Sequence, residues 1–172
     1  MSVLSAQSIR HLCSPDEKER LNYSRLEFGP VYPLISPFVP EKVVVNGKSY
    51  GLSACTYDCR IAESIVIGPT KAALVSTKEY FSLPATICGS VLDKSSYARV
   101  FVSAFNTHLD PGWSGYLTVE LVNLGYEHIR FTQGDPVCQI KFEWLDYPTE
   151  IPYQGKYQNQ EAGPQEARYE KR

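Results

Sequence analysis

The chain has 172 residues, of which 43% are hydrophobic and 21% are charged. These values are typical of one globular domain with a substantial hydrophobic core. The formal net charge of −2 argues against a general nucleic-acid binder, which carries a basic excess. No apolar run reaches the roughly 18 residues of a membrane span, so we expect no membrane association.

The five cysteines are an odd number and share no metal-ligand spacing with the three histidines. They are typical of reduced, mostly buried thiols, and the N-terminus has no signal-peptide pattern, so a cytoplasmic protein is expected. Cys55 and Cys59 lie close in sequence, but no second pair completes a zinc site. We therefore expect no zinc.

The first predicted element is a short helix that begins after Ser5 and places Ile9 and Leu12 on one face. Residues 14–48 follow; they are polar and rich in proline. That composition rejects long helices and predicts extended segments joined by turns.

From Tyr50 onward, short β-branched and aromatic runs alternate with Gly, Pro, Asp and Asn turn signals. Many short strands at this spacing predict an all-β barrel or jelly roll. The expected strands are residues 61–67, 72–76, 86–92, 100–105, 116–121, 128–132 and 137–144.

After Pro148 the composition changes, and residues 153–172 contain almost no aliphatic side chains. Two interpretations stay open for them: a frayed tail, or a flap that orders over a ligand. We expect residues 1–152 to form one β domain and residues 153–172 to form a flexible flap.

Two cations and two hydroxyls lie within six residues of the sequence: Lys94, Ser95, Ser96 and Arg99. A solvated turn with ordinary surface charges is one interpretation. The other is a phosphate cradle, because hydroxyls donate to phosphate oxygens and arginine binds them bidentately.

Glu120 interrupts an otherwise apolar strand, where alternation places it on one face with Tyr116, Thr118 and Val122. It is either an exposed Glu on a half-solvated sheet or a Glu that points into a pocket and transfers protons. Asp110, before Pro111-Gly112, is either a turn residue or a ligand for a sugar hydroxyl.

Several familiar site patterns are missing from the sequence. It has no His-x-Glu followed by Pro-Cys-x-x-Cys, no Gly-x-x-x-x-Gly-Lys-Ser/Thr loop and no Gly-x-Ser-x-Gly elbow. These absences argue against a zinc-dependent nucleoside deaminase, a P-loop protein and an α/β-hydrolase.

Three motifs occur close together in the second half of the chain. They are Lys-Ser-Ser-Tyr-Ala-Arg at 94–99, Asp-Pro-Gly-Trp-Ser-Gly at 110–115 and Thr-Val-Glu-Leu at 118–121. With Ser-Tyr-Gly-Leu-Ser at 49–53, Tyr-Asp-Cys-Arg at 57–60 and the tail at 152–160, they resemble the dCTP deaminase family of the dUTPase-like superfamily. The similarity extends over nearly the whole chain and is weakest at residues 14–48. Phe101 stands where this family commonly has Gly.

The resemblance implies a distorted β-barrel, a homotrimer with active sites between subunits, and metal-free deamination at C4 of cytosine. Mg²⁺ would travel with the nucleotide phosphates. By the same resemblance, Glu120 is the general base, positioned with its water by Ser95 and Arg99. Substrate contacts are implied for Lys94, Ser96, Asp110, Gln139, Tyr153, Lys156 and Gln160, and the backbone of 106–108 is a candidate for reading the base.

The leading hypothesis is a dCTP deaminase that produces dUTP and ammonia in a cytoplasmic setting, the host cytoplasm if the chain is viral. One alternative is a bifunctional enzyme that also cleaves the triphosphate to dUMP and pyrophosphate. Others are a deaminase that also accepts dCMP and, outside enzymes, a nucleotide-binding regulatory trimer. The Glu at position 120 argues against pure binding, because a binder has no need of a proton-transfer group.

Overall fold

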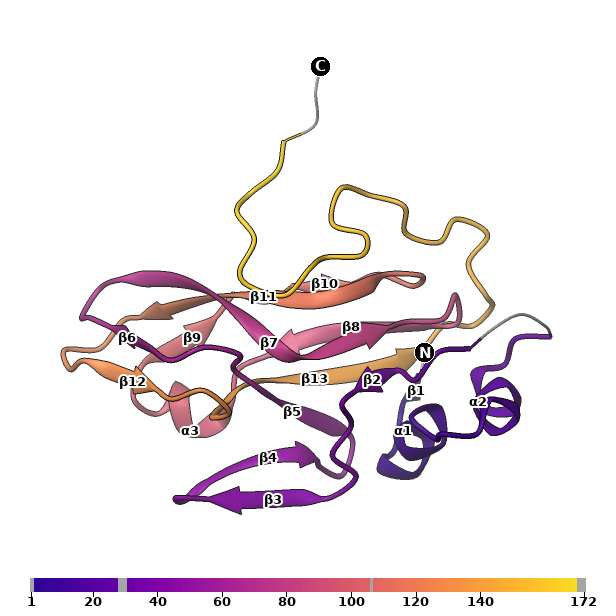
Figure 1. Cartoon of the computed structure of the whole chain (residues 1–172), viewed down its shortest axis with the longest axis horizontal. Coiled ribbons are helices and arrows are strands. Elements are labelled where there is room, and N and C mark those ends of the chain that lie inside the picture. Colours follow the sequence, from indigo (N-terminus) through magenta and orange to yellow (C-terminus); the bar gives the residue numbers. More distant parts are fainter. Residues whose placement is uncertain (1, 28–30, 106, 170–172) are drawn as a thin grey trace.

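The computed structural model describes residues 2–27, 31–105 and 107–169, and strands dominate them (Figure 1). The helices of this part of the chain are α1 (Ala6–Leu12), α2 (Glu17–Ser24) and α3 (Ser95–Ala98). Its strands are β1 (Ser2–Val3), β2 (Ile35–Ser36), β3 (Lys42–Val45), β4 (Lys48–Leu52), β5 (Thr56–Arg60), β6 (Ile65–Ile67), β7 (Ala72–Ser82), β8 (Ile87–Leu92), β9 (Val102–Ala104), β10 (His108–Leu109), β11 (Ser114–Asn123), β12 (Ile129–Phe131) and β13 (Pro136–Trp144).

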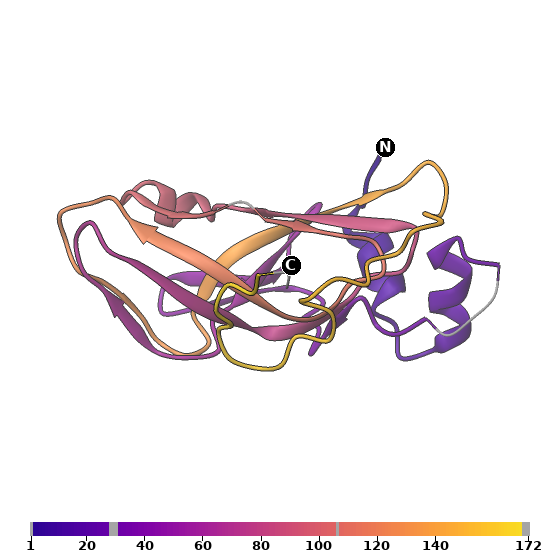
Figure 2. The same cartoon turned by 90° about the horizontal axis from the view of Figure 1, so that it is seen from above.

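These strands form two curled sheets and a small ribbon. The seven-stranded sheet has the order β10-β8-β13-β5-β4-β3, with β1 also paired to β13, and the four-stranded sheet has the order β2-β7-β11-β9. The ribbon pairs β12 with β6. Seen from above, the strands of the two larger sheets lie over one another, while α1 and α2 sit together at one end (Figure 2). The expected all-β architecture is confirmed.

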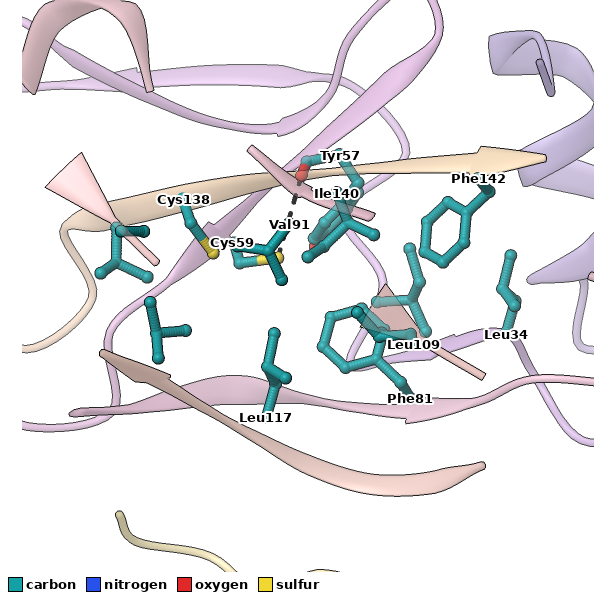
Figure 3. Close-up of a cluster of buried hydrophobic side chains, with 14 of the residues drawn as sticks. Leu34, Tyr57, Cys59, Phe81, Val91, Leu109, Leu117, Cys138, Ile140 and Phe142 are labelled. Carbon is teal, nitrogen blue, oxygen red and sulfur yellow. Dashed lines mark hydrogen bonds between the residues drawn. The ribbon is translucent and has the colours of Figure 1, made fainter. Parts of the chain in front are cut away.

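The core lies between the two larger sheets (Figure 3). The seven-stranded sheet contributes Cys59, Ile140 and Phe142, while Phe81 and Leu117 come from the four-stranded sheet, and all five are buried. Along β13, Cys138 and Ile140 point into this core, so the intervening Gln139 faces outward. Each sheet therefore has one apolar inner face and one outer face that carries polar groups.

The pairing of β7 with β11 organises the four-stranded sheet. Burial along β11 alternates at every residue: Leu117, Val119 and Leu121 are buried, while Thr118 and Glu120 are half-buried. This is the alternation that the sequence predicted. It turns Glu120 away from the core.

At the N-terminus the capped helix is confirmed, since the Ser5 hydroxyl accepts a hydrogen bond from the Ser8 amide at the start of α1. The expectation of extended segments joined by turns in residues 14–48 needs one correction, because the short helix α2 begins after the Asp16 cap. This helix buries Arg20, whose guanidinium donates to the carbonyls of Ser14 and Val31. Among the described residues, no helix combines the length and apolarity needed to cross a bilayer.

A buried ion pair connects the two larger sheets. Glu79 on β7 is fully buried, and the Arg60 side chain on β5 reaches it with Nε 2.6 Å from Oε1. The Arg60 backbone amide donates to the other carboxylate oxygen at 2.9 Å. Burial raises the pKa of Glu79, and these hydrogen bonds from Arg60 oppose that effect. Removing either partner leaves an uncompensated polar group inside the protein.

Arg60→Ala is expected to lower the free energy of unfolding by about 3–5 kcal/mol, because Glu79 then stays buried without its partner. Urea denaturation monitored by tryptophan fluorescence measures this loss. Lys48→Ala is the matched control: the Lys48–Asp135 pair is more exposed, and its loss should cost no more than about 1 kcal/mol. Equal losses in the two variants would contradict the assignment.

Candidate active site

A cavity of about 410 Å³ opens on the outer face of β11, beneath the C-terminal tail. That volume lies within the usual range of small-molecule sites. Its walls come from β7, β10, β11, the loop between β10 and β11, and the tail. The lining residues are Leu74, Thr107, His108, Leu109, Asp110, Trp113, Leu117, Thr118, Glu120, Tyr153, Tyr157, Gln160, Gln165 and Ala167.

Glu120 enters this cavity from the middle of β11, where a rigid strand fixes its backbone. Its partner across the sheet is Leu74 on β7, which also lines the cavity. Glu120 and the apolar side chain of Leu74 therefore form neighbouring parts of the cavity wall. Of the two interpretations of Glu120, the structure favours a side chain in a pocket.

The tail covers this face by pairing with β11. The Gln160 carbonyl accepts from the Tyr116 amide at 3.0 Å, and the Asn159 amide donates to the Ser114 carbonyl at 2.8 Å. Trp113 adds a side-chain bond from Nε1 to the Tyr157 carbonyl at 2.8 Å. In Figure 1 the tail runs above β11 and β10 before it leaves the body of the protein.

Gly115 makes this close approach possible. A Cβ atom at position 115 would lie 2.8 Å from the Gln160 backbone nitrogen, closer than real Cβ contacts allow. The second glycine of the segment, Gly112, has a φ of +85°, and a Cβ atom there would lie 2.6 Å from the Pro152 ring. The two glycines explain why the Asp-Pro-Gly-Trp-Ser-Gly segment can receive the tail.

Thr118, two residues before Glu120, binds the tail at a second point. Its hydroxyl accepts from the Gln160 side-chain amide and, at 3.0 Å, from the Gln165 backbone amide. One hydroxyl on the Glu120 face thus receives two donors from the tail. Alternation along the strand predicted this face for Thr118, but no sequence pattern indicated its role.

Asp110 and Tyr153 form the rim of the cavity near the tail. The Tyr153 amide donates to the Pro111 carbonyl at 2.8 Å, which brings its ring beside the Asp110 turn. The Asp110 side chain is about half exposed, at 52%, and leaves its carboxylate available. His108 Nε2 lies 3.9 Å from Asp110 Oδ1, a neighbour that no sequence pattern indicated.

The other predicted site residues lie away from this cavity. Ser95 and Ser96 are exposed on the single turn α3, and Arg99 follows it with Nη1 2.9 Å from the Ser95 carbonyl. Lys94 is buried with Asp58, Nζ to Oδ2 2.5 Å. In Figure 1, α3 lies on the opposite side of the sheets from the tail.

The hydrophobic core separates these two groups. Gln139 is on the outer face of the seven-stranded sheet and donates from Nε2 to the Asp93 carbonyl at 2.8 Å. Glu120 is on the outer face of the four-stranded sheet, so one chain alone does not bring it to Gln139 or Lys94. Lys156 is exposed on the tail, with Nζ 5.6 Å from the Tyr157 ring centre.

The segment that was a candidate for reading the base lies at one wall of the cavity. Thr107 and His108 line it, whereas Asn106 falls outside the described residues. The aromatic residues Trp113 and Tyr157 complete the lining, and no spacing in the sequence indicated their convergence with Glu120.

Comparison with known proteins identifies the family of this chain. A family model described as "dCTP deaminase-like" matches residues 42–145. The chain belongs to this family. A dCTP deaminase of Acidobacterium capsulatum is 31% identical over 161 residues, covering 75% of this chain and 88% of its own. A dCTP deaminase of Thermococcus gammatolerans is 34% identical over 131 residues, and this match covers 73% of this chain and 83% of the relative.

Solved structures add evidence about the fold of this dCTP deaminase-like chain. A mutant dUTPase from phage phi11 of S. aureus, described with a structural Mg(II) ion, superimposes with a TM-score of 0.50. The two chains are 17% identical, and the match covers 59% of this chain and 84% of the dUTPase. At that identity the similarity supports the dUTPase-like fold alone.

Thr118→Val is expected to release the tail, because both donors then lose their acceptor. Amide hydrogen exchange of residues 158–167 should accelerate by about thirtyfold, since two hydrogen bonds of roughly 1 kcal/mol each are lost. Thr118→Ser retains the hydroxyl and should exchange like the parent protein. Unchanged exchange in the valine variant would show that the tail is held by its backbone contacts alone.

Proposed function

We propose that this protein deaminates a deoxycytidine nucleotide by hydrolysis, converting dCTP and water into dUTP and ammonia. The observation that supports the proposal best is the cavity that Glu120 lines together with Asp110, Tyr153 and Gln160. A carboxylate held beside an apolar wall, with hydroxyl and amide groups around it, suits proton transfer to and from a bound base.

In this mechanism Glu120 takes a proton from water as the water oxygen bonds to C4 of cytosine and the C4=N3 electron pair moves to N3. The same carboxyl then delivers that proton to the amino nitrogen as the C4–N bond breaks and ammonia leaves. The proton left on the added oxygen moves to N3 as the C4=O bond of uracil forms. One carboxylate performs both transfers if it lies between the water and the amino group. Hydrogen-bond donors fixed around the tetrahedral intermediate stabilise its charge.

Ser95 and Arg99, which the family resemblance assigns to positioning the water and Glu120, lie outside the cavity of their own chain. Their participation therefore requires α3 of a second copy at the β11 face of the first. We propose a homotrimer in which each site is shared between two neighbours. This arrangement would bring together the two outer faces that one chain keeps apart.

The surface around Arg99 supports such an assembly. Val100, Phe101, Leu124 and Tyr126 are exposed there by 46%, 65%, 64% and 91%. The Leu124 amide donates to the Phe101 carbonyl at 2.8 Å, so the two loops are adjacent. Phe101 has a φ of +62°, a backbone conformation that is strained for a bulky residue. An apolar cluster held at that cost suits a covered interface.

The nucleotide phosphates would be bound by Lys156 and Gln160 from the tail and by Lys94, Ser96 and Gln139 from the α3 side. Asp110 would accept the 3′-hydroxyl, and the Tyr153 ring would pack beside the sugar. Mg²⁺ would coordinate the triphosphate oxygens and keep several waters, as this ion prefers. Among the described residues no cluster of three or more His, Cys, Asp or Glu gathers as a cage, and coordination through phosphate needs none.

The direct test is incubation with dCTP, dCMP, CTP and dUTP, measuring ammonia and nucleotide products. We expect ammonia and dUTP from dCTP, and Glu120→Gln should lower kcat by about 10²–10⁴-fold because it removes the proton acceptor. Release of dUMP and pyrophosphate in addition would identify a bifunctional enzyme. Nucleotide binding without ammonia from any cytosine nucleotide would instead support a regulatory trimer and contradict the proposal.

Phe101→Asp is expected to convert the trimer to monomers at micromolar concentration, because it places a charge in the proposed interface, and to abolish ammonia release. Light scattering after size-exclusion chromatography measures the assembly. Val44→Asp, at a site exposed by a similar 64% on β3, should leave both mass and activity unchanged. A trimer that survives Phe101→Asp would remove this surface from the interface.

A further inference from the structure

Lys94 and Asp58 form an ion pair that is nearly buried although it lies outside the hydrophobic core. Side-chain exposure is 10% for Lys94 and 12% for Asp58, and the Nζ–Oδ2 distance is 2.5 Å. Nearly buried ion pairs cost desolvation free energy that their attraction barely offsets, so they are weak contributors to stability. A role in orienting one of the two groups accounts better for this pair.

The strand register explains how the pair forms. On neighbouring strands Asp58 of β5 lies opposite Gln139 of β13, which lies opposite Leu92 of β8. Lys94 follows Leu92 by two residues, and its side chain returns across this row to reach Asp58. The ammonium group is thereby bound to Asp58, whose cross-strand partner Gln139 is on the outer face of the seven-stranded sheet.

The backbone beside Lys94 is fixed as well. Gln139 donates to the Asp93 carbonyl, and the Asp93 carboxylate accepts from the Ala104 amide at 2.7 Å and from the Ser103 hydroxyl at 2.9 Å. Lys94 thus follows a residue held by hydrogen bonds on both its carbonyl and its carboxylate, and its own side chain ends at Asp58. Of its three ammonium donors, one is directed to Asp58.

We propose that Asp58 is a positioning residue that holds the Lys94 ammonium ready for the phosphate chain of the nucleotide. The proposal rests on the function proposed above and adds a residue to its phosphate-binding side. A free lysine loses rotamer freedom when it binds phosphate, whereas one already held in place loses little. The two ammonium protons that Asp58 does not use are the donors left for phosphate oxygens.

The test measures dissociation constants by calorimetry in a Glu120→Gln background, which prevents turnover, with dCTP, dCMP and deoxycytidine as probes. Asp58→Asn should weaken dCTP binding by roughly threefold to tenfold, the effect of one side chain that is no longer immobilised. Deoxycytidine binding should not change, because it has no phosphate. Glu143→Gln, which breaks the Lys141–Glu143 pair on β13, is the control and should change neither constant.

A double-mutant cycle shows whether Asp58 acts through Lys94. With Lys94→Met already present, Asp58→Asn should weaken dCTP binding no further. The double variant buries no unpaired charge, so it remains measurable even if Asp58→Asn alone folds poorly.

Several outcomes would overturn the proposal. Equal losses for dCTP and deoxycytidine would mean that Asp58 only supports the fold, and additive losses in the cycle would mean that it acts without Lys94. Tighter dCTP binding by Asp58→Asn would mean that Asp58 competes with phosphate for the Lys94 ammonium group. If the parent protein does not bind dCTP at all, Lys94 has no triphosphate to bind, and the proposal is wrong. If the parent protein binds dCTP but releases no ammonia, the proposed deamination is wrong. The binding measurements still test the role of Asp58 in that case.

Discussion

The hydrophobic core between the two curled sheets is the constraint on which the rest of this structure depends. Because β11 and β13 each direct alternate residues inward, their remaining residues form two polar faces that point away from each other. Glu120 and the tail occupy one face, and Gln139 and Lys94 occupy the other. Under the proposed function, a reaction that uses both groups needs a second copy of the chain.

The tail shows how a segment with few aliphatic residues is ordered without a core of its own. It is held by backbone pairing to Ser114 and Tyr116, by Trp113 Nε1 and by the hydroxyl of Thr118. Glycine at position 115 removes the side chain that would block this approach. These are polar, local contacts of modest strength, which agrees with the expectation that the tail acts as a flap over a ligand.

Local pattern predicted the parts of the fold that local chemistry determines. Ser5 caps α1, and the alternation around Glu120 is the alternation of β11. The helix α2 was missed because it has no apolar face: it is fixed by Arg20, which donates to carbonyls on both sides of the helix. A buried arginine whose partners are backbone carbonyls leaves no periodic signal in the sequence.

Strand β5 shows why the site was only partly predictable. Its sequence, Thr-Tyr-Asp-Cys-Arg, places two charges within five residues, which is a poor strand signal. In the structure Asp58 is neutralised by Lys94, 36 positions away, and Arg60 by Glu79, 19 positions away. Such partners come together only after the sheets form, so the sequence identifies the charged residues but not the pairs. The two pairs differ in their place in the fold: Arg60–Glu79 joins the two sheets across the core, whereas Lys94–Asp58 lies on the outer side of the seven-stranded sheet.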